Sequence, residues 1–447
     1  MLSRSDRKRK KAKVAVPAKR LAAWASIAAL CLIIVLFSIY ESNRSKQAVD
    51  NENLPENPQA TDHVTNTPGS SQEPEQTAPA NTPTNEPSES AKPSPQATAI
   101  ATTPAGATTV PLPTAKPTQT VAPQTPVSGA KVKLTFVGDV MFADRVEEQL
   151  IKNGYDYPYS FVKEYLQKAD LTIANLETPI TKREEAQSKE KYVYRSSPLA
   201  LPAFKDAGFD LVNLANNHIL DYGKEGLFDT FKELDKMGIK YVGAGKNADD
   251  AFKSVIIEKQ GIKIAFLGFS RFVPEGSWKA AFDNPGVADA YNHERPVEEI
   301  KKAREKADLV VVIPHWGVER TDYPVEHQTD LAHRFIDAGA DLIVASHPHV
   351  LQGLESYKGK WIAYSLGNFI FTLNEVQKTW ESAILEATCS KERECNLQLV
   401  PIKNTLARPE IMTPELGTAL FERLTKLSIK SKVDKDGKVI PLQKVKK

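Results

Sequence analysis

The pattern of hydrophobic and polar positions changes at Lys131, where short apolar runs begin to alternate with amphipathic stretches. The apolar runs are rich in β-branched residues and predict strands within 132–139, 171–177, 210–218, 261–269, 308–317 and 341–349. The stretches between them have a helical period and predict helices at Pro198–Gly208, Gly223–Met237, Pro296–Ala307 and Pro324–Ala338. Strands separated by helices of this length are typical of an α/β fold with a largely parallel or mixed sheet.

The later part of the chain alternates apolar and polar residues with the period of a strand. It predicts antiparallel strands at 362–371, 382–389 and 395–403, which we expect to close a second sheet. A final helix at Pro414–Leu427 and a basic tail follow. We therefore predict one folded domain at 131–408, with the C-terminal helix and tail at 409–447.

The first 40 residues have the pattern of a membrane anchor. Residues 1–20 hold nine Lys and Arg against one acid, and residues 21–40 hold no charge, a length that crosses the hydrocarbon core of a bilayer. The alternative, a cleaved signal peptide, would have a shorter apolar core and a small-x-small cleavage site, which Ser38–Glu41 does not offer. We expect an uncleaved transmembrane signal-anchor, with the basic tail in the cytoplasm and the rest of the chain extracellular.

Residues 41–130 separate the anchor from the domain and are low in sequence complexity. They hold 15 of the 30 prolines, together with many Thr, Ala, Ser and Gln residues. Such a segment cannot bury enough apolar area to offset the entropy of ordering it, so we predict a disordered linker that holds the domain away from the membrane.

The charge balance argues against a nucleic-acid partner. The chain has a net charge of +2, whereas residues 1–20 alone carry +8. The part beyond the tail is therefore about −6. The basic pI of the chain is due to the basic residues 1–20, and we expect no binding of DNA or RNA.

Two of the three cysteines lie on either side of a short polar stretch. Cys389 and Cys395 flank SKERE, which we expect to form the tip of a hairpin. In an oxidising compartment they could form a local disulfide, and two free thiols in a loop are the alternative. Cys31 lies in the predicted membrane span.

The predicted strands end in side chains of the types that bind metals. In α/β sheets ligands bind at the carboxyl ends of the strands, where loops from several strands converge. Each strand ending alone also fits an ordinary turn, a helix cap or a core histidine. Five such strand endings follow in order, and they contain four of the eight histidines, which favours a metal site. The residues are Asp139, Asn175, Glu177, Asn217, His218, His315, His347 and His349.

Six ordered motifs resemble the capsule-synthesis CapA family, the poly-γ-glutamate synthesis proteins. They are FVGDVMF, ANLETPIT, NLANNHILDYG, PHWGVE, SHPHVLQG and YSLGNFIF, and the resemblance covers about Val132 to Asn404. That family is similar in fold to the calcineurin-like metallophosphatases. The resemblance therefore implies a metallophosphatase-like four-layer α/β/β/α sandwich with a metal centre.

The resemblance also implies roles for the residues of the first two motifs. Asp139 matches a ligand of one metal ion. Either Glu177 or Asn175 matches the residue that bridges two ions, and Glu177 supplies the charge for that role. The parent pattern has a histidine two residues after its first aspartate, where this chain has Met141. One tightly bound ion with a second that is weak or absent is consistent with this difference.

The later motifs imply the second half of the site. Asn217 matches the amide ligand of the second ion, and His218 matches the neighbouring histidine that acts as an acid or stabilises the leaving group. His315 matches the next ligand. His347 and His349 match paired histidines that are divided between the two ions.

These ligand types indicate the cofactor and its chemistry. A divalent ion held by carboxylate, amide and imidazole groups lowers the pKa of bound water and polarises a substrate oxygen. Ligation by nitrogen and oxygen without thiolate suits Mn, Zn or Fe and does not choose among them. We expect one or two such ions.

Four further residues are candidates around the metal ligands. Arg195 is a candidate for holding an anionic group of the substrate, because its guanidinium matches such groups, although a surface arginine is the alternative. Asp221 is a candidate for orienting the imidazole of His218, three residues earlier. Ser365 and Asn368 are candidates for the floor of the site, where a purely structural turn is equally compatible.

Three functions fit these features. The first is an extracellular, membrane-anchored component of capsule or poly-γ-glutamate biosynthesis or export, with a metal-dependent hydrolase-like site. Its partners would be the anionic polymer and membrane synthase components. The second is a generic cell-envelope metallophosphoesterase. The third is a non-catalytic scaffold for polymer binding or assembly, which the methionine at position 141 favours.

Overall fold

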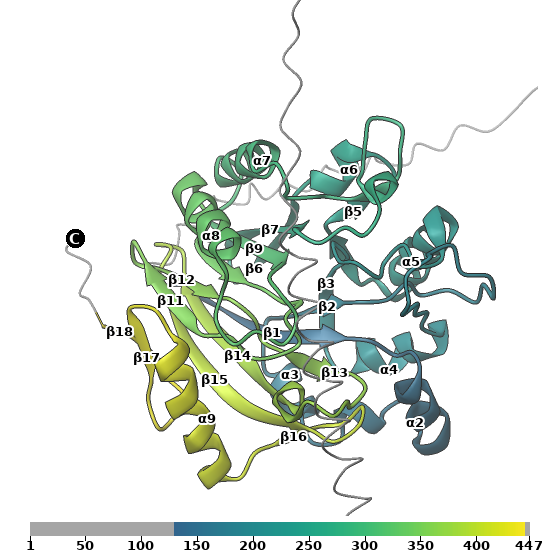
Figure 1. The fold of residues 1–447 in the computed structure, drawn as a ribbon. Coiled ribbons are helices and arrows are strands. Elements are labelled where there is room, and N and C mark those ends of the chain that lie inside the picture. Colours follow the sequence, from purple (N-terminus) through teal and green to yellow (C-terminus); the bar gives the residue numbers. More distant parts are fainter. Residues whose placement is uncertain (1–128, 443–447) are drawn as a thin grey trace, which may run out of the picture. The chain divides into compact units, whose positions relative to one another are not determined.

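Two β-sheets pack against each other in the computed structural model, which describes residues 129–442 (Figure 1). The predicted transmembrane segment at residues 21–40 and residues 41–128 of the predicted linker lie outside the described residues. Within residues 129–442, no helix is both long and apolar enough to cross a membrane. The alternation of strands and helices confirms the predicted α/β class.

The first sheet has the strand order β16-β15-β14-β1-β2-β3-β4, with β13 beside the end of β1. Its parallel part consists of β1 (Lys131–Val140), β2 (Leu171–Leu176), β3 (Phe209–Asn213), β4 (Lys240–Val242) and β13 (Asn368–Ile370). Its antiparallel part consists of β14 (Glu381–Ser390), β15 (Cys395–Asn404) and β16 (Pro409–Ile411).

The second sheet has the order β11-β12-β10-β9-β7-β6. These strands are β6 (Val255–Lys259), β7 (Ile262–Ser270), β9 (Leu309–His315), β10 (Leu342–Val344), β11 (Leu354–Tyr357) and β12 (Lys360–Ala363). Two small pairs complete the strands: β5 (Ala244–Gly245) with β8 (Gly286–Val287), and β17 (Ser431–Val433) with β18 (Val439–Pro441).

The expectation that the later strands close a second sheet is wrong for β14 and β15, which extend the first sheet from β1. The predicted strand at 362–371 is interrupted at Gly367, whose φ is 68°. Its first half becomes β12 in the second sheet and its second half becomes β13 beside β1. The chain crosses between the sheets at this turn, so the following hairpin pairs with the free edge of β1.

Helices cover the outer face of each sheet. The first sheet carries α2 (Arg145–Asn153), α3 (Lys163–Gln167), α4 (Leu201–Asp206) and α5 (Gly223–Met237). The second carries α6 (Ala248–Phe252), α7 (Glu294–Arg304) and α8 (Glu326–Ala338). Short 3₁₀ helices lie at Tyr157–Tyr159, Pro198–Ala200, Gly276–Trp278 and Gln377–Trp380. α5 has the predicted bounds, and α7 and α8 are found with small shifts at their ends. The helix predicted at Pro198–Gly208 is a 3₁₀ turn followed by α4.

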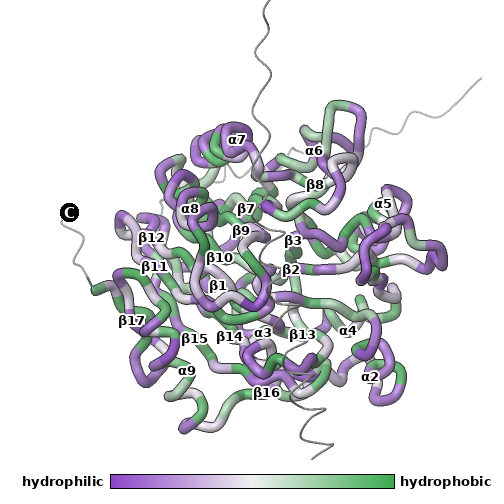
Figure 2. The backbone as a smooth tube through the Cα atoms, viewed as in Figure 1, coloured by the Kyte–Doolittle hydropathy of each residue, from purple (hydrophilic) through white to green (hydrophobic). Residues whose placement is uncertain are grey.

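The core between the sheets combines apolar side chains from both of them, for example Phe136 of β1, Phe266 of β7 and Val311 of β9. All three are at most 1% exposed. In Figure 2 the central strands are largely hydrophobic, whereas the outer helices alternate hydrophobic and hydrophilic positions. Burial on both faces explains why these strands read as nearly continuous apolar runs.

The C-terminal segment is part of this core. α9 (Pro414–Leu427) has the predicted bounds, and its Leu420, Phe421 and Leu424 join the cluster between the sheets. β16 pairs with β15, so the domain continues to Leu442 instead of ending at residue 408. A disulfide joins Cys389 and Cys395 across the β14–β15 hairpin, as one of the two alternatives for these cysteines predicted.

Candidate metal centre

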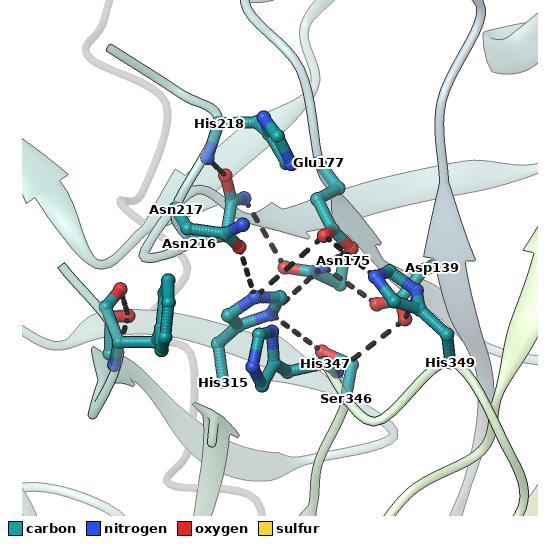
Figure 3. Close-up of polar contacts among 12 residues, drawn as sticks. Asp139, Asn175, Glu177, Asn216, Asn217, His218, His315, Ser346, His347 and His349 are labelled. Atoms are coloured by element: carbon teal, nitrogen blue, oxygen red, sulfur yellow. Dashed lines mark hydrogen bonds and ion pairs between the residues drawn. The ribbon is translucent and has the colours of Figure 1, made fainter. Parts of the chain in front are cut away.

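The carboxyl ends of the parallel strands of both sheets meet at one rim, and polar side chains gather there. Asp139 lies at the end of β1, and Glu177 directly follows β2. From the second sheet, His315 ends β9, and His347 and His349 follow β10. Figure 3 shows these five side chains turned toward one another.

One group of donor atoms comes from Asp139, Glu177 and His349, which lie within 4.8 Å of one another. Nδ1 of His349 is 3.3 Å from Oδ2 of Asp139, and its Nε2 is 3.6 Å from Oε1 of Glu177. The Asp139 and Glu177 side chains are fully buried. The carboxylates and the imidazole therefore face a single point.

A second group comes from Glu177, His315 and His347, again within 4.8 Å. Nε2 of His315 is 3.8 Å from Oε1 of Glu177 and 2.7 Å from the amide oxygen of Asn217. Asn217 therefore presents its oxygen to the same point. Glu177 belongs to both groups, which is the arrangement that a bridging carboxylate requires.

Two buried atoms of these groups lack the hydrogen-bond partners that burial normally demands. Within the described residues, Oε1 of Glu177 and Nδ1 of His347 have no hydrogen bond. Both residues are at most 1% exposed. Leaving a buried polar atom unpaired is costly, and a cation among these lone pairs would satisfy both atoms. The residues present therefore fit a divalent ion.

The protonation of two of the three histidines, His315 and His347, suits metal binding. Burial lowers the pKa of His347 to about 3, and the charge of neighbouring His349 lowers it too. Burial also holds the pKa of His315 well below its usual range. Both imidazoles are therefore neutral at physiological pH, the form that coordinates a metal. Burial acts to lower the pKa of His349, but the hydrogen bond and charge of Asp139 outweigh it and leave this pKa raised.

The pKa values of the two carboxyl groups, Glu177 and Asp139, shift in opposite directions. Burial raises the pKa of Glu177 well above its usual range, and the charge of Asp139 raises it further. Burial also acts to raise the pKa of Asp139, but the hydrogen bond and charge of His349 outweigh it and leave this pKa lowered. The surroundings therefore disfavour the ionised form of Glu177, and a bound cation would stabilise that form.

Asn175 occupies the centre of a buried hydrogen-bond network. Its Nδ2 donates to Oδ1 of Asp139 at 2.8 Å and to Oε2 of Glu177 at 3.2 Å, and it lies 3.3 Å from Nδ1 of His315. Its Oδ1 accepts from the amides of Asn213 and Asn216. Both ends of the Asn175 amide are occupied by hydrogen bonds, whereas Glu177 belongs to both groups and is the better candidate for the bridging ligand.

The backbone is strained at both paired histidines. His347 has a φ of 101° and His349 a φ of 56°, on either side of Pro348. Non-glycine residues rarely adopt positive φ, and such strain persists where the surrounding structure imposes it, often at functional sites. The amide of His347 donates to Oδ2 of Asp139 at 3.4 Å, which helps to hold this turn.

Three other predicted residues surround the ligands. Nδ1 of His218 donates to Oδ2 of buried Asp221 at 2.9 Å, as the predicted orienting role of Asp221 requires. Nδ1 of His349 donates to Oδ1 of Asn368 at 2.8 Å, which leaves its Nε2 for the site. Ser365 supports the turn before Asn368, because its hydroxyl donates to the carbonyl of Val350.

A cleft of about 600 Å³ opens beside these residues. His218, His349, Asn217 and Asn368 line it. Arg195, the predicted anion-binding residue, is partly exposed but is not among the described residues that line the cleft. The cations there are Arg145, Lys191 and Arg320.

Sequence reasoning missed these three cations because exposed basic residues carry no periodic signal, and their positions depend on loop conformation. It also missed the part that Asn213 plays at the end of β3. Asn213 donates to Asn175 and accepts from the amide of Ala215. The run of asparagines at 213–217 could have indicated this network.

Met141, the position without the expected histidine, is completely buried, and its amide donates to the carbonyl of Ile370. The first group therefore has three side chains, Asp139, Glu177 and His349. The second group has four, because Asn217 adds to its three. The two candidate metal positions therefore differ in the number of side chains that could bind an ion.

Comparison with known proteins identifies the family. The family described as bacterial capsule synthesis protein PGA_cap matches residues 133–373, which is more than half of the chain. This chain belongs to that family. The matched region contains all six side chains of the two groups.

Three relatives of this PGA_cap protein illustrate the similarity. "Capsule biosynthesis protein CapA" of Bacillus anthracis is 36% identical over 317 residues, which cover 69% of this chain and 76% of the relative. "PGA biosynthesis protein CapA" of Bacillus subtilis is 36% identical over 277 residues, 62% of this chain and 72% of the relative. "Probable polyglutamine synthesis accessory protein Rv0574c" of Mycobacterium tuberculosis is 31% identical over 246 residues, 52% and 64% respectively.

Proposed function

We propose that this protein works in the biosynthesis or export of a bacterial capsule polymer, poly-γ-glutamate, and that its strand-end centre is a metal-dependent hydrolase-like site. The names of the relatives support the polymer. The observation that carries the site is the buried Glu177 carboxylate, which two groups of metal-ligand side chains share. Ordinary packing gives no reason to bury Oε1 of Glu177 and Nδ1 of His347 without a hydrogen-bond partner.

The arrangement supports a likeness to the metallophosphatases, with the chain forming a four-layer α/β/β/α sandwich. Asp139, Glu177 and His349 would hold one ion. Glu177, Asn217, His315 and His347 would hold the other. Mn, Zn or Fe fits these oxygen and nitrogen donors, and the position with four side chains would bind more tightly.

A divalent ion bound there would lower the pKa of a coordinated water and polarise an oxygen of the substrate. His218 would supply a proton to the leaving group at the cleft. Its Nδ1 is fixed on Asp221, so its Nε2 is the nitrogen that is free to exchange a proton. Asn368 would keep the imidazole of His349 in the orientation that presents Nε2.

The same proposal places the domain outside the cell, anchored by residues 21–40 with the basic residues 1–20 in the cytoplasm. The Cys389–Cys395 disulfide supports this location, because disulfides persist in oxidising compartments. There the domain would contact the anionic polymer and membrane synthase components.

The test is hydrolysis by the purified full-length protein in the presence of Mn²⁺. Poly-γ-glutamate and bis-p-nitrophenyl phosphate are assayed side by side with wild-type protein and His218→Ala. His293→Ala is the matched control, since His293 is the N-cap residue of α7 and does not line the cleft. We expect cleavage of poly-γ-glutamate that His218→Ala reduces and His293→Ala does not.

Three other results of this assay would point to a different function. Turnover of the ester alone would replace the capsule role with that of a cell-envelope metallophosphoesterase. Metal-dependent polymer binding without turnover of either substrate would identify a non-catalytic scaffold. The methionine at position 141, in place of a metal-binding histidine, favours that alternative. A protein that binds neither metal nor polymer would contradict the proposal.

A further inference from the structure

The cleft beside the candidate metal centre is lined by three acidic and three basic side chains, in addition to its histidines. These six residues form three pairs of neighbours along the chain, and in each pair an acid directly precedes a base. We call them the charge pairs of the cleft. They are Asp144 with Arg145, Glu190 with Lys191, and Glu319 with Arg320.

The charge pairs come from three separate parts of the chain. The first lies where α2 begins, the second in the long loop after β2, and the third in the loop after β9. The strands before these segments, β1, β2 and β9, are the ones that bring Asp139, Glu177 and His315 to the rim. The fold therefore delivers the charge pairs and the candidate ligands to the same place.

The charges of the cleft do not neutralise one another. Within residues 129–442, none of the six side chains forms an ion pair or a side-chain hydrogen bond, and all six are exposed. Elsewhere in the same residues, arginines commonly pair with Asp or Glu. Seven of them do so: Arg183, Arg295, Arg304, Arg334, Arg393, Arg408 and Arg423. The charge pairs are therefore left available to a ligand.

The backbone at the charge pairs is held in place. Asp144 has a φ of 55° and Arg320 a φ of 61°, which non-glycine residues adopt rarely and mostly where the surrounding structure imposes it. The amide of Arg320 donates to the carbonyl of Pro348 at 2.7 Å, and the amide of Glu190 donates to Oγ of Ser188 at 3.1 Å. Groups that are already positioned lose less entropy when a ligand binds.

The equal numbers of acids and bases restrict the kind of ligand that the cleft favours. A ligand of a single sign would be attracted by three of these side chains and repelled by the other three, so the net charge offers it no advantage. A ligand that carries both signs close together can be complementary to all of them. The charge pairs therefore favour a zwitterionic group.

A glutamate chain joined through its γ-carboxyl groups has such a group at one position. Each interior residue carries a free α-carboxylate and neutral amides, so the interior is uniformly negative. The residue at the amino end carries an ammonium group and a carboxylate on the same carbon atom. This end alone presents both signs together.

We propose that the charge pairs of the cleft bind the zwitterionic amino end of the polymer. The acids would face its ammonium group and the bases its α-carboxylate, an anion that Arg binds with two parallel hydrogen bonds. This inference rests on the proposed function, because the polymer is taken from it. His218 and His349 line the same cleft, so the first amide of the chain would lie toward the candidate metal centre.

Calorimetry with two γ-linked glutamate pentamers tests this, one with a free and one with an acetylated amino end. The full-length, Mn²⁺-loaded protein carries His218→Ala to slow cleavage during the titration. We expect the free pentamer to bind roughly tenfold more tightly, which corresponds to one hydrogen bond to a charged group. Asp144→Asn/Glu190→Gln should remove most of this preference by weakening the free pentamer alone, and Lys191→Gln should weaken both pentamers.

Glu305→Gln and Lys306→Gln are the matched controls, because Glu305 and Lys306 are also exposed neighbours of opposite charge but do not line the cleft. Both controls should keep the preference. Equal affinities for the two pentamers, tighter binding of the acetylated one, or a preference that survives in Asp144→Asn/Glu190→Gln would overturn this inference and leave the proposed function standing. If neither pentamer binds, the proposed function fails as well.

Discussion

Asn175 lies at the centre of the hydrogen-bond network that joins the candidate metal ligands. Its amide contacts both carboxylates, Asp139 and Glu177, and His315 lies 3.3 Å from the same nitrogen. Since Asn213 and Asn216 hold the opposite end, the amide cannot turn without breaking several buried hydrogen bonds. Such outer partners fix the orientation of metal ligands.

We predict that Asn175→Ala weakens metal affinity by roughly 10- to 100-fold, because Asp139 and Glu177 lose their common donor. Competition with a chelating dye measures the affinity. Asn153→Ala is the matched control, since Asn153 is an exposed residue at the end of α2. An unchanged affinity in Asn175→Ala would show that the network does not orient the ligands.

Asp221 links the proposed acid to the cleft wall. Its Oδ2 accepts from His218 and from the amide of Tyr194, and its carbonyl accepts from the amides of Gln187 and Ser188. We predict that Asp221→Ala lowers the turnover of poly-γ-glutamate by about 100-fold with metal content retained. His218→Ala should have a similar effect.

Combining the two substitutions tests whether they act together. Residues that act as a unit are not additive, so Asp221→Ala/His218→Ala should be little slower than His218→Ala alone. Steady-state kinetics of the three variants provides the comparison. Multiplied effects in the double variant would mean that Asp221 and His218 act independently.

Among the elements, β1 and the turn before β13 approach each other closely beside the candidate metal centre. A Cβ on Gly138 would lie 1.9 Å from the carbonyl oxygen of Gly367, and the amide of Asp139 donates to that oxygen at 3.0 Å. Only glycine at position 138 permits this contact. The position of Asp139 therefore depends on a residue that carries no side chain.

We predict that Gly138→Ala destabilises the domain by about 2 kcal/mol or more, because backbone must move to accept the methyl group. Urea denaturation measures the free energy of unfolding. Gly276→Ala is the control, since an added Cβ there meets nothing within 4 Å. Equal stability of the two variants would refute the close approach of β1 and β13.

The periodicity of hydrophobic residues in the sequence predicts most helices and strands, but it does not predict which strands pair with each other. α5 and α9 have the predicted bounds because their apolar faces and their ends are clear in the sequence. The sheet to which β14 and β15 belong was missed. That choice depends on the turn at Gly367, a tertiary feature that periodicity does not report.

At the scale of the whole molecule, the C-terminal segment completes the core between the sheets. Leu420, Phe421, Leu424, Val433 and Val439 are at most 7% exposed. Charge and length alone suggested a helix followed by a tail. The packing shows that residues 409–442 belong to the folded domain.

We predict that a chain ending at Arg408 loses cooperative unfolding or aggregates. Removal of α9 would expose the apolar surface on which this helix packs. Thermal melting followed by circular dichroism, with dye binding to exposed apolar surface, measures this. A chain ending at Leu442 is the control and should melt like the full protein. Identical melting of the chain that ends at Arg408 would contradict the role of α9.

The candidate ligands could be predicted from the sequence because they follow directly after strands, and parallel strands bring their carboxyl ends to one rim. Asp139, Glu177, His315, His347 and His349 do meet there. The surrounding cleft could not be predicted, since its cations and rings come from loops whose paths have no period. Arg195 shows the difference, because three other basic residues line the cleft.

Calorimetric titration of the metal-free protein with Mn²⁺ tests the central claim most directly. We predict binding in which the position with Glu177, Asn217, His315 and His347 fills first, and complete loss of binding in His347→Ala/His349→Ala with the fold intact by circular dichroism. His293→Ala should bind like wild type. If the wild-type protein binds neither Mn²⁺ nor Zn²⁺ nor Fe²⁺, the shared carboxylate of Glu177 does not belong to a metal centre.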